Sequence, residues 1–131
     1  MKYQFFRIPH LVMALAIIFI FINCKDEDVT SSLNAYLDAA DCTNTLPTYS
    51  GNVQSIFNLN CSTTGCHDNS TAAIGLTMEG YDNAKASFTD FDILCTINHD
   101  SGCKDMPQGG SKLSDEDILL ITCWVKNDYP E

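Results

Sequence analysis

Positive charge is scarce in this sequence, whose 131 residues carry 7 Lys and Arg against 17 Asp and Glu, for a formal net charge of −10. A protein that binds nucleic acid needs a positive patch to neutralise phosphate groups, and no stretch of the chain supplies one. We therefore expect no nucleic-acid partner. The length allows one domain and little more.

Several other patterns are also missing. The chain has no internal repeat, no low-complexity tract and no sign of a strand-rich fold. It has no phosphate-binding loop and no nucleophile paired with a general base. We therefore predict a small all-α protein that is not an enzyme.

The longest apolar run, residues 11–22, is short. These 12 residues would cover about 18 Å of helix, against a hydrocarbon core of roughly 30 Å. Because Lys2 and Arg7 precede the run, we assign residues 1–23 to a secretory signal peptide. Cys24 follows at once, and the arrangement resembles the lipobox of bacterial lipoproteins, which implies lipidation of Cys24. An uncleaved anchor, with a plain thiol at this position, is the alternative.

Both interpretations place the protein on a membrane outside the cytoplasm. We expect it to be lipid-anchored to the outer membrane, on the periplasmic side or at the cell surface. The acidic run 25–28 resembles the signal that sends some Gram-negative lipoproteins to the surface, and a solvated linker is the alternative. Seven cysteines in so short a chain also favour an oxidising compartment over the cytosol.

The rest of the chain is predicted to form a tether and a domain. Residues 24–48 read as an acidic tether with a short helix, and residues 49–131 as the compact domain. Inside the domain we expect a short helix over 81–88 and a loop with two cysteines over 91–107. The clearest helix signal starts at Ser114, a capping residue followed by three acidic residues.

The main motif is residues 61–67, Cys-Ser-Thr-Thr-Gly-Cys-His. Two thiols with a His directly after the second are typical of covalent haem attachment, usually with two residues between the cysteines. Cys61 and Cys66 would add to the two haem vinyl groups, and His67 would lie under the iron as an axial ligand. Four residues separate the cysteines here, and Gly65 favours the turn that the extra residues need.

Two alternatives for this motif stay open. The two thiols can form a disulfide with each other, which leaves the His as a surface residue. Otherwise Cys61, Cys66, His67 and a further Cys can bind Zn²⁺, because structural zinc sites use these ligands.

A second axial ligand is predicted at Met106, 39 residues beyond His67 and directly before Pro107. Thioether sulfur is a soft ligand suited to iron, and the Pro and the glycines after it favour a loop that approaches the haem closely. Met78 reads as a wall residue, and His99 has polar neighbours and is expected in solvent. For a lone Met, filling of the core is the alternative role.

Together these segments resemble the small monohaem class I c-type cytochromes over residues 52–130. The matching stretches are 53–57, 65–67, 75–77, 106–110 and 113–118. The resemblance implies a cytochrome c-like fold, with N- and C-terminal helices packed around one covalently attached haem c. It also implies covalent attachment at Cys61 and Cys66 and axial ligation by His67 and Met106.

Four cysteines remain once lipidation and haem attachment are assigned: Cys42, Cys95, Cys103 and Cys123. In an oxidising compartment they suggest two disulfides, for which three pairings exist. We favour Cys95 with Cys103, which would brace the loop ahead of the predicted Met ligand. Cys42 would then pair with Cys123 and pin the segment before the domain to the last helix. Free buried thiols are the alternative.

The predicted function is electron transfer by a membrane-tethered carrier with a single haem c. Because protein groups fill both axial positions, no site is open for a substrate, although the domain can serve as an accessory subunit of an oxidoreductase. The acidic surface favours a redox partner with a basic docking face. The alternative function is a disulfide-stapled or zinc-binding structural or binding lipoprotein domain without haem.

Overall fold

The computed structural model describes residues 29–131. The predicted signal peptide (1–23), Cys24 and the acidic run 25–28 lie outside the described residues. Within residues 29–131 the protein contains helices and no strand, which confirms the all-α prediction. None of the helices in this part is long and apolar enough to cross a membrane.

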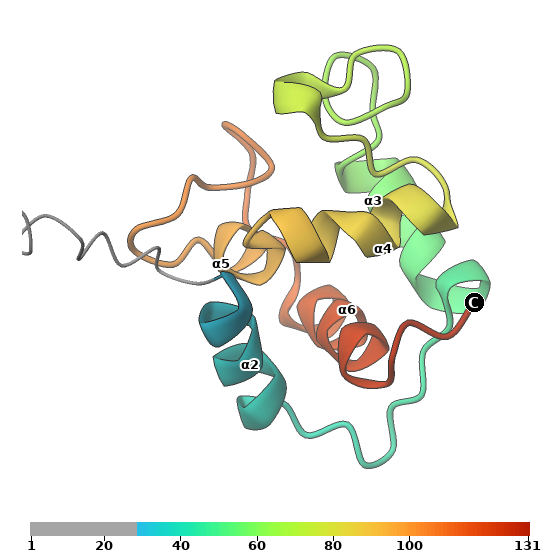
Figure 1. Cartoon of the computed structure of the whole chain (residues 1–131), viewed down its shortest axis with the longest axis vertical. Coiled ribbons are helices and arrows are strands. Elements are labelled where there is room, and N and C mark those ends of the chain that lie inside the picture. Colours follow the sequence, from blue (N-terminus) through green and yellow to red (C-terminus); the bar gives the residue numbers. More distant parts are fainter. Residues whose placement is uncertain (1–28) are drawn as a thin grey trace, which may run out of the picture.

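The helical segments are joined by connections of very different length, the longest of which precedes α6. They are α2 (Val29–Ala39), the π-helical turn η1 (Tyr49–Val53), α3 (Gln54–Asn60), the 3-10 turn η2 (Ala73–Gly75), α4 (Tyr81–Asp90), α5 (Ile93–Asn98) and α6 (Asp115–Lys126). Figure 1 shows α6 in the middle, with α4 across it and with α2 and α3 on opposite sides.

The last helix, α6, begins as predicted. The Ser114 hydroxyl accepts a hydrogen bond from the backbone N–H of Asp117 at 3.1 Å, which caps the first turn. Three acidic residues lie near the positive end of the helix dipole and Lys126 lies near its negative end. The inner face of the helix is buried, so both its termini and its packing stabilise it.

Trp124 is the centre of the core. Its side chain is fully buried, and its ring lies 5.0–6.1 Å from the rings of Tyr49, Phe57, Phe88 and Tyr129, centroid to centroid. These rings belong to η1, α3, α4 and the C-terminal tail. Aromatic pairs of this kind contribute about 0.5–1.5 kcal/mol each beyond the area that they bury. The cluster therefore joins the first and last helices of the domain.

The C-terminal tail (residues 127–131) packs against the same aromatic cluster around Trp124. The carbonyl oxygen of Pro130 accepts hydrogen bonds from the backbone N–H of Tyr49 at 2.8 Å and from the indole N–H of Trp124 at 2.9 Å. The Tyr81 hydroxyl donates to the Tyr129 carbonyl at 2.7 Å. The tail is thus bonded to η1, α4 and α6.

Helix α5 lies inside the stretch 91–107 that we predicted as a loop, so this prediction was wrong for residues 93–98. The Asp92 side chain accepts a hydrogen bond from the N–H of Cys95 and starts the helix. Ile93, Leu94 and Ile97 are buried in the core. Six residues are too few to show a repeating helical pattern in a sequence, and burial of this apolar face stabilises the helix instead.

Helix α2 occupies part of the stretch predicted as a tether. Apolar side chains of α2 pack against the core, and Figure 1 shows the helix below α5. The hydroxyl of Tyr36 donates to Asp100 at 2.6 Å and the hydroxyl of Ser32 donates to Asp92 at 2.6 Å. Burial, together with the Asp100 carboxylate, raises the pKa of Tyr36, so the phenol keeps its proton and continues to donate. Helix α2 is therefore part of the packed body.

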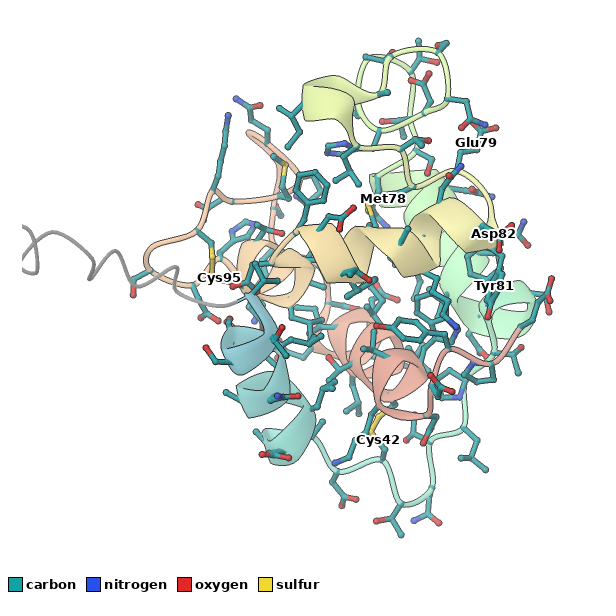
Figure 2. All side chains as sticks on the ribbon, in the orientation of Figure 1. Cys42, Met78, Glu79, Tyr81, Asp82 and Cys95 are labelled. Atoms are coloured by element: carbon teal, nitrogen blue, oxygen red, sulfur yellow. A yellow bond between two sulfur atoms is a disulfide. The ribbon has the colours of Figure 1, made fainter. Side chains whose placement is uncertain are left out.

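Two disulfides are present, in the pairing favoured from the sequence. Cys42 is bonded to Cys123 and Cys95 to Cys103. The first joins the segment after α2 to α6, and the second joins α5 to the loop that follows it (Figure 2).

We expect the two disulfides to contribute differently to stability, because they close loops of different length. Replacing Cys42 and Cys123 by Ser should lower the free energy of unfolding by about 4.5 kcal/mol, since the bridge spans 81 residues. Replacing Cys95 and Cys103 by Ser should cost about 2.5 kcal/mol, since that bridge spans 8 residues. Denaturant unfolding followed by circular dichroism measures both, and the reverse order would contradict this expectation.

Candidate functional site: a cavity between two loops

A cavity of about 730 Å³ lies between the loop after α3 (residues 61–72) and the loop before α6 (residues 99–114). Its volume falls within the range of about 300–1,000 Å³ that is typical of ligand and cofactor sites. Its innermost wall is apolar and buried, and it consists of Leu76, Met78, Ile93, Ile97 and Leu113. In Figure 1 the two loops stand apart as separate arms, one light green and one orange.

The residues that we predicted as haem-binding all line this one cavity. Cys61, Cys66 and His67 come from the arm after α3, and Met106 comes from the arm before α6. Met78 also lines the cavity and is 3% exposed, in agreement with its predicted role as a wall residue. The fold thus places the Met106 thioether at the same cavity as the thiols and the imidazole of residues 61–67, although Met106 lies 39 residues beyond His67.

The two cavity thiols are free. Cys61 is partly buried and Cys66 is exposed, and the disulfide that we considered between them is not formed. Burial raises the pKa of the Cys61 thiol to about 12, with a further contribution from the neighbouring Cys66. Burial therefore keeps Cys61 in its thiol form at neutral pH.

The arm that carries these thiols is held by a carboxylate. Asp68 accepts hydrogen bonds from the backbone N–H groups of Gly65, Ser70 and Thr71 at 3.1, 2.8 and 2.9 Å, and one from the Ser70 hydroxyl. The Ser70 hydroxyl above all, followed by the amides of Thr71 and Ser70, holds the pKa of Asp68 well below its usual range. Gly65 has a φ of 89°, a conformation that favours glycine, as the turn in this motif predicted.

His67 is buried and held in one orientation. Its Nδ1 lies 3.2 Å from the carbonyl oxygen of Leu76. Since a carbonyl can only accept, this hydrogen bond requires the proton on Nδ1, and in the neutral ring Nε2 then carries the free lone pair. The main chain is fixed as well, because the N–H of His67 donates to Cys61 and its carbonyl accepts from Met78. A second hydrogen bond of this kind is what orients a metal-binding imidazole.

The second arm folds back at Met106. The N–H of Met106 donates to the carbonyl of Thr96 in α5 at 3.1 Å. The N–H of Gly110 donates to the carbonyl of Pro107 at 3.0 Å, and Gly109 between them has a φ of 73°. Residues 107–110 therefore form a tight turn directly after the Met.

His99 lies elsewhere than we expected. It was predicted in solvent because its neighbours in sequence are polar, but its side chain is only 21% exposed. Its Nε2 lies 3.0 Å from the carbonyl oxygen of Met106, and its Nδ1 lies 3.9 Å from the Asp105 carboxylate. This contact follows from helix α5, which ends directly before His99, so the residue was missed together with the helix.

The predicted zinc site is not assembled in the described part of the chain. Among residues 29–131, a group of three or more potential ligands with all ligand atoms within 4.8 Å occurs only at Asp92, Cys95 and Cys103. Two of these are bonded to each other in a disulfide. Cys42 and Cys123 are paired as well, so no further thiol is free there to complete a site with Cys61 and Cys66.

No protein-family model matches this sequence, and neither a curated protein nor a solved structure is significantly similar to it. The side chains around the cavity are therefore the basis on which a function can be assigned.

Replacing Asp68 by Ala should loosen the arm that carries the two thiols. The amides of Gly65, Ser70 and Thr71 would lose their acceptor and exchange their hydrogens several-fold faster, while amides in α6 would keep their wild-type rates. Hydrogen exchange followed by NMR measures this, and unchanged exchange at all three amides would count against the assigned role of Asp68.

Proposed function

We propose that this protein is an electron carrier with one covalently bound haem c in the cavity between the two arms. Cys61 and Cys66 would form the thioether bonds, and His67 and Met106 would be the axial ligands. One observation carries this proposal: these four residues, two of them thiols left free while four other cysteines are paired, line a single cavity.

The chemistry of the donor set fits a haem. Nε2 of His67 is the ring nitrogen left available, because Nδ1 is hydrogen-bonded to Leu76. A Met on the other arm offers the soft ligand of a His/Met pair, which raises the reduction potential. The buried apolar wall is suited to a large aromatic macrocycle, and the free thiols lie on the same arm as the His. The four-residue gap between the cysteines is accommodated by the turn at Gly65.

The helix arrangement supports a cytochrome c-like fold. Helix α3 leads directly into the residues of the haem-binding motif, and α6 follows directly after the Met106 arm. The Phe57 ring of α3 lies against the Trp124 ring of α6, with 6.1 Å between the two ring centroids. A ring contact between an N-terminal and a C-terminal helix beside the cavity agrees with the helix crossing that the resemblance to class I cytochromes implied.

When bound, haem c supplies an iron that takes up and releases one electron. The protein's own part is to hold and shield it. The hydrogen bond from His67 to Leu76 fixes the tautomer and increases the basicity of Nε2. With His67 and Met106 as ligands no position is left for a substrate, so we propose a carrier, or an accessory subunit of an oxidoreductase, in place of an enzyme.

The proposed setting is the outer membrane, with a lipid on Cys24 as the anchor. The net charge of −10 supports a redox partner with a basic docking face, attracted in a salt-dependent way. The second candidate function is a disulfide-stapled binding or structural domain without haem, which the two disulfides alone would also suit.

The first test asks whether haem is covalently attached to the protein. Protein produced with cytochrome c maturation factors should give a pyridine haemochrome spectrum, and the haem should survive acid-acetone extraction. Replacing Cys61 and Cys66 by Ala should abolish covalent attachment, because both thioether bonds are lost. Replacing Cys42 and Cys123 by Ser is the matched control and should retain it. A folded but colourless wild-type protein would reject the proposal and leave the stapled domain.

The second axial ligand has its own test. The oxidised haem protein should show the charge-transfer band between Met sulfur and iron, and Met106→Ala should abolish it because the thioether is removed. Met78→Leu, a replacement of similar volume in the cavity wall, should retain the band. Loss of the band in Met78→Leu with retention in Met106→Ala would assign the ligand to Met78.

A further inference from the structure

We infer that helix α5 positions the Met106 sulfur through a clamp that consists of the Cys95–Cys103 disulfide, the Thr96 carbonyl and the His99 ring. This inference deepens the proposed function and rests on it, because it assigns positioning residues to the second axial ligand. It comes from contacts of the loop with α5 that the haem-binding motif itself does not involve.

The covalent part of the clamp lies three residues before Met106. The disulfide joins Cys95, inside α5, to Cys103 in the loop, across a sequence separation of only 8. Two hydrogen bonds reinforce this short ring: Asp100 N–H donates to the Cys95 carbonyl at 3.2 Å, and Cys103 N–H donates to the Asp100 carbonyl at 3.3 Å. The start of the Met106 arm is therefore fixed to the helix.

The hydrogen-bonded part of the clamp holds both main-chain polar groups of Met106. Its N–H donates to the Thr96 carbonyl at 3.1 Å, and its carbonyl oxygen lies 3.0 Å from Nε2 of His99. Because a carbonyl only accepts, this contact is a hydrogen bond when Nε2 carries a proton. With both groups bonded to one helix, the freedom that remains to the sulfur is the rotation of the Met side chain.

The helix that supplies the clamp is itself well anchored. Ile93, Leu94 and Ile97 are buried in the core. On the other side, α2 donates hydrogen bonds to Asp92 and Asp100, the residues just outside the two ends of α5. The clamp therefore connects the Met106 arm to the rigid body of the domain.

The clamp and the haem-attachment motif are separate in the structure. None of the clamp contacts described above involves Cys61, Cys66 or His67, which lie on the other arm. Loss of the clamp should therefore leave haem attached and the His ligand bound, while the Met ligand is released more easily.

The experiment compares variants of the full-length haem protein in its oxidised form. Cys95→Ser/Cys103→Ser should weaken the Met-to-iron band and let imidazole, added as a competing ligand, bind at least about tenfold more tightly, because the loop gains conformational freedom. The bridge is removed by substitution, since a thiol reductant would also reduce the iron. His99→Ala should tighten imidazole binding by a smaller factor, about threefold, because one hydrogen bond is lost. His99→Gln should return the affinity toward wild type, since its amide can donate to the same carbonyl.

The control is Cys42→Ser/Cys123→Ser, which removes the longer disulfide. It should destabilise the fold more, yet keep the wild-type band and imidazole affinity, because that bridge does not touch the Met106 arm. Wild-type band and affinity in both the Cys95/Cys103 and the His99→Ala variants would overturn the clamp. Equal changes in the control would overturn it too, since they would show a general effect of stability. Absence of covalent haem from the wild-type protein would instead reject the proposed function.

Discussion

Burial of the Trp124 side chain is the constraint on which the rest of the domain depends. The indole, carried by α6, is fully buried, and η1, α3, α4 and the C-terminal tail each contribute a ring or a carbonyl group to its surroundings. Burying a side chain of this size removes about 150–250 Å² from water, which is worth several kcal/mol. No other side chain of the described core is both as large and as completely enclosed.

This packing decides where the two cavity arms begin and end. Helix α3 holds Phe57 against Trp124 and continues directly into Cys61, while α6 carries Trp124 itself and follows the Met106 arm. Two loops that are distant in the chain are therefore held at neighbouring points of one core. Each is then shaped locally, the first by Asp68 and by the Leu76 carbonyl and the second by its contacts with α5. The core supplies proximity and the local hydrogen bonds supply orientation.

Much of the fold was predictable because its signals are local. The cap at Ser114 with the acidic first turn predicted the start of α6, and the pattern over 81–88 predicted most of α4. The cysteine count predicted two disulfides, and the pairing that we favoured among the three possible ones is the one observed. The candidate site was also found locally, since Cys66 and His67 are adjacent in sequence.

What sequence reasoning missed depends on contacts between distant segments. Helix α5 is too short for a periodic pattern, and its buried face makes sense only next to α2 and α6. The contact of His99 with the Met106 carbonyl needs that helix to exist, so polar neighbours misled the prediction. In the same way, the acceptor for the His67 ring is a carbonyl nine residues further on, and a carbonyl group has no sequence signature.

The packing of α2 also sets how far the domain can move from a membrane. A tether that ended only at residue 48 would allow wide excursions, but α2 begins at Val29, five positions after Cys24, and is hydrogen-bonded to the body through Ser32 and Tyr36. A peptide chain extends by at most about 3.6 Å per residue, so a lipid on Cys24 would keep Val29 within about 18 Å of the bilayer surface. The proposed carrier would then exchange electrons only with partners in the same membrane or with molecules that diffuse to its surface, so diffusion within the lipid layer would govern its encounters with membrane-bound partners.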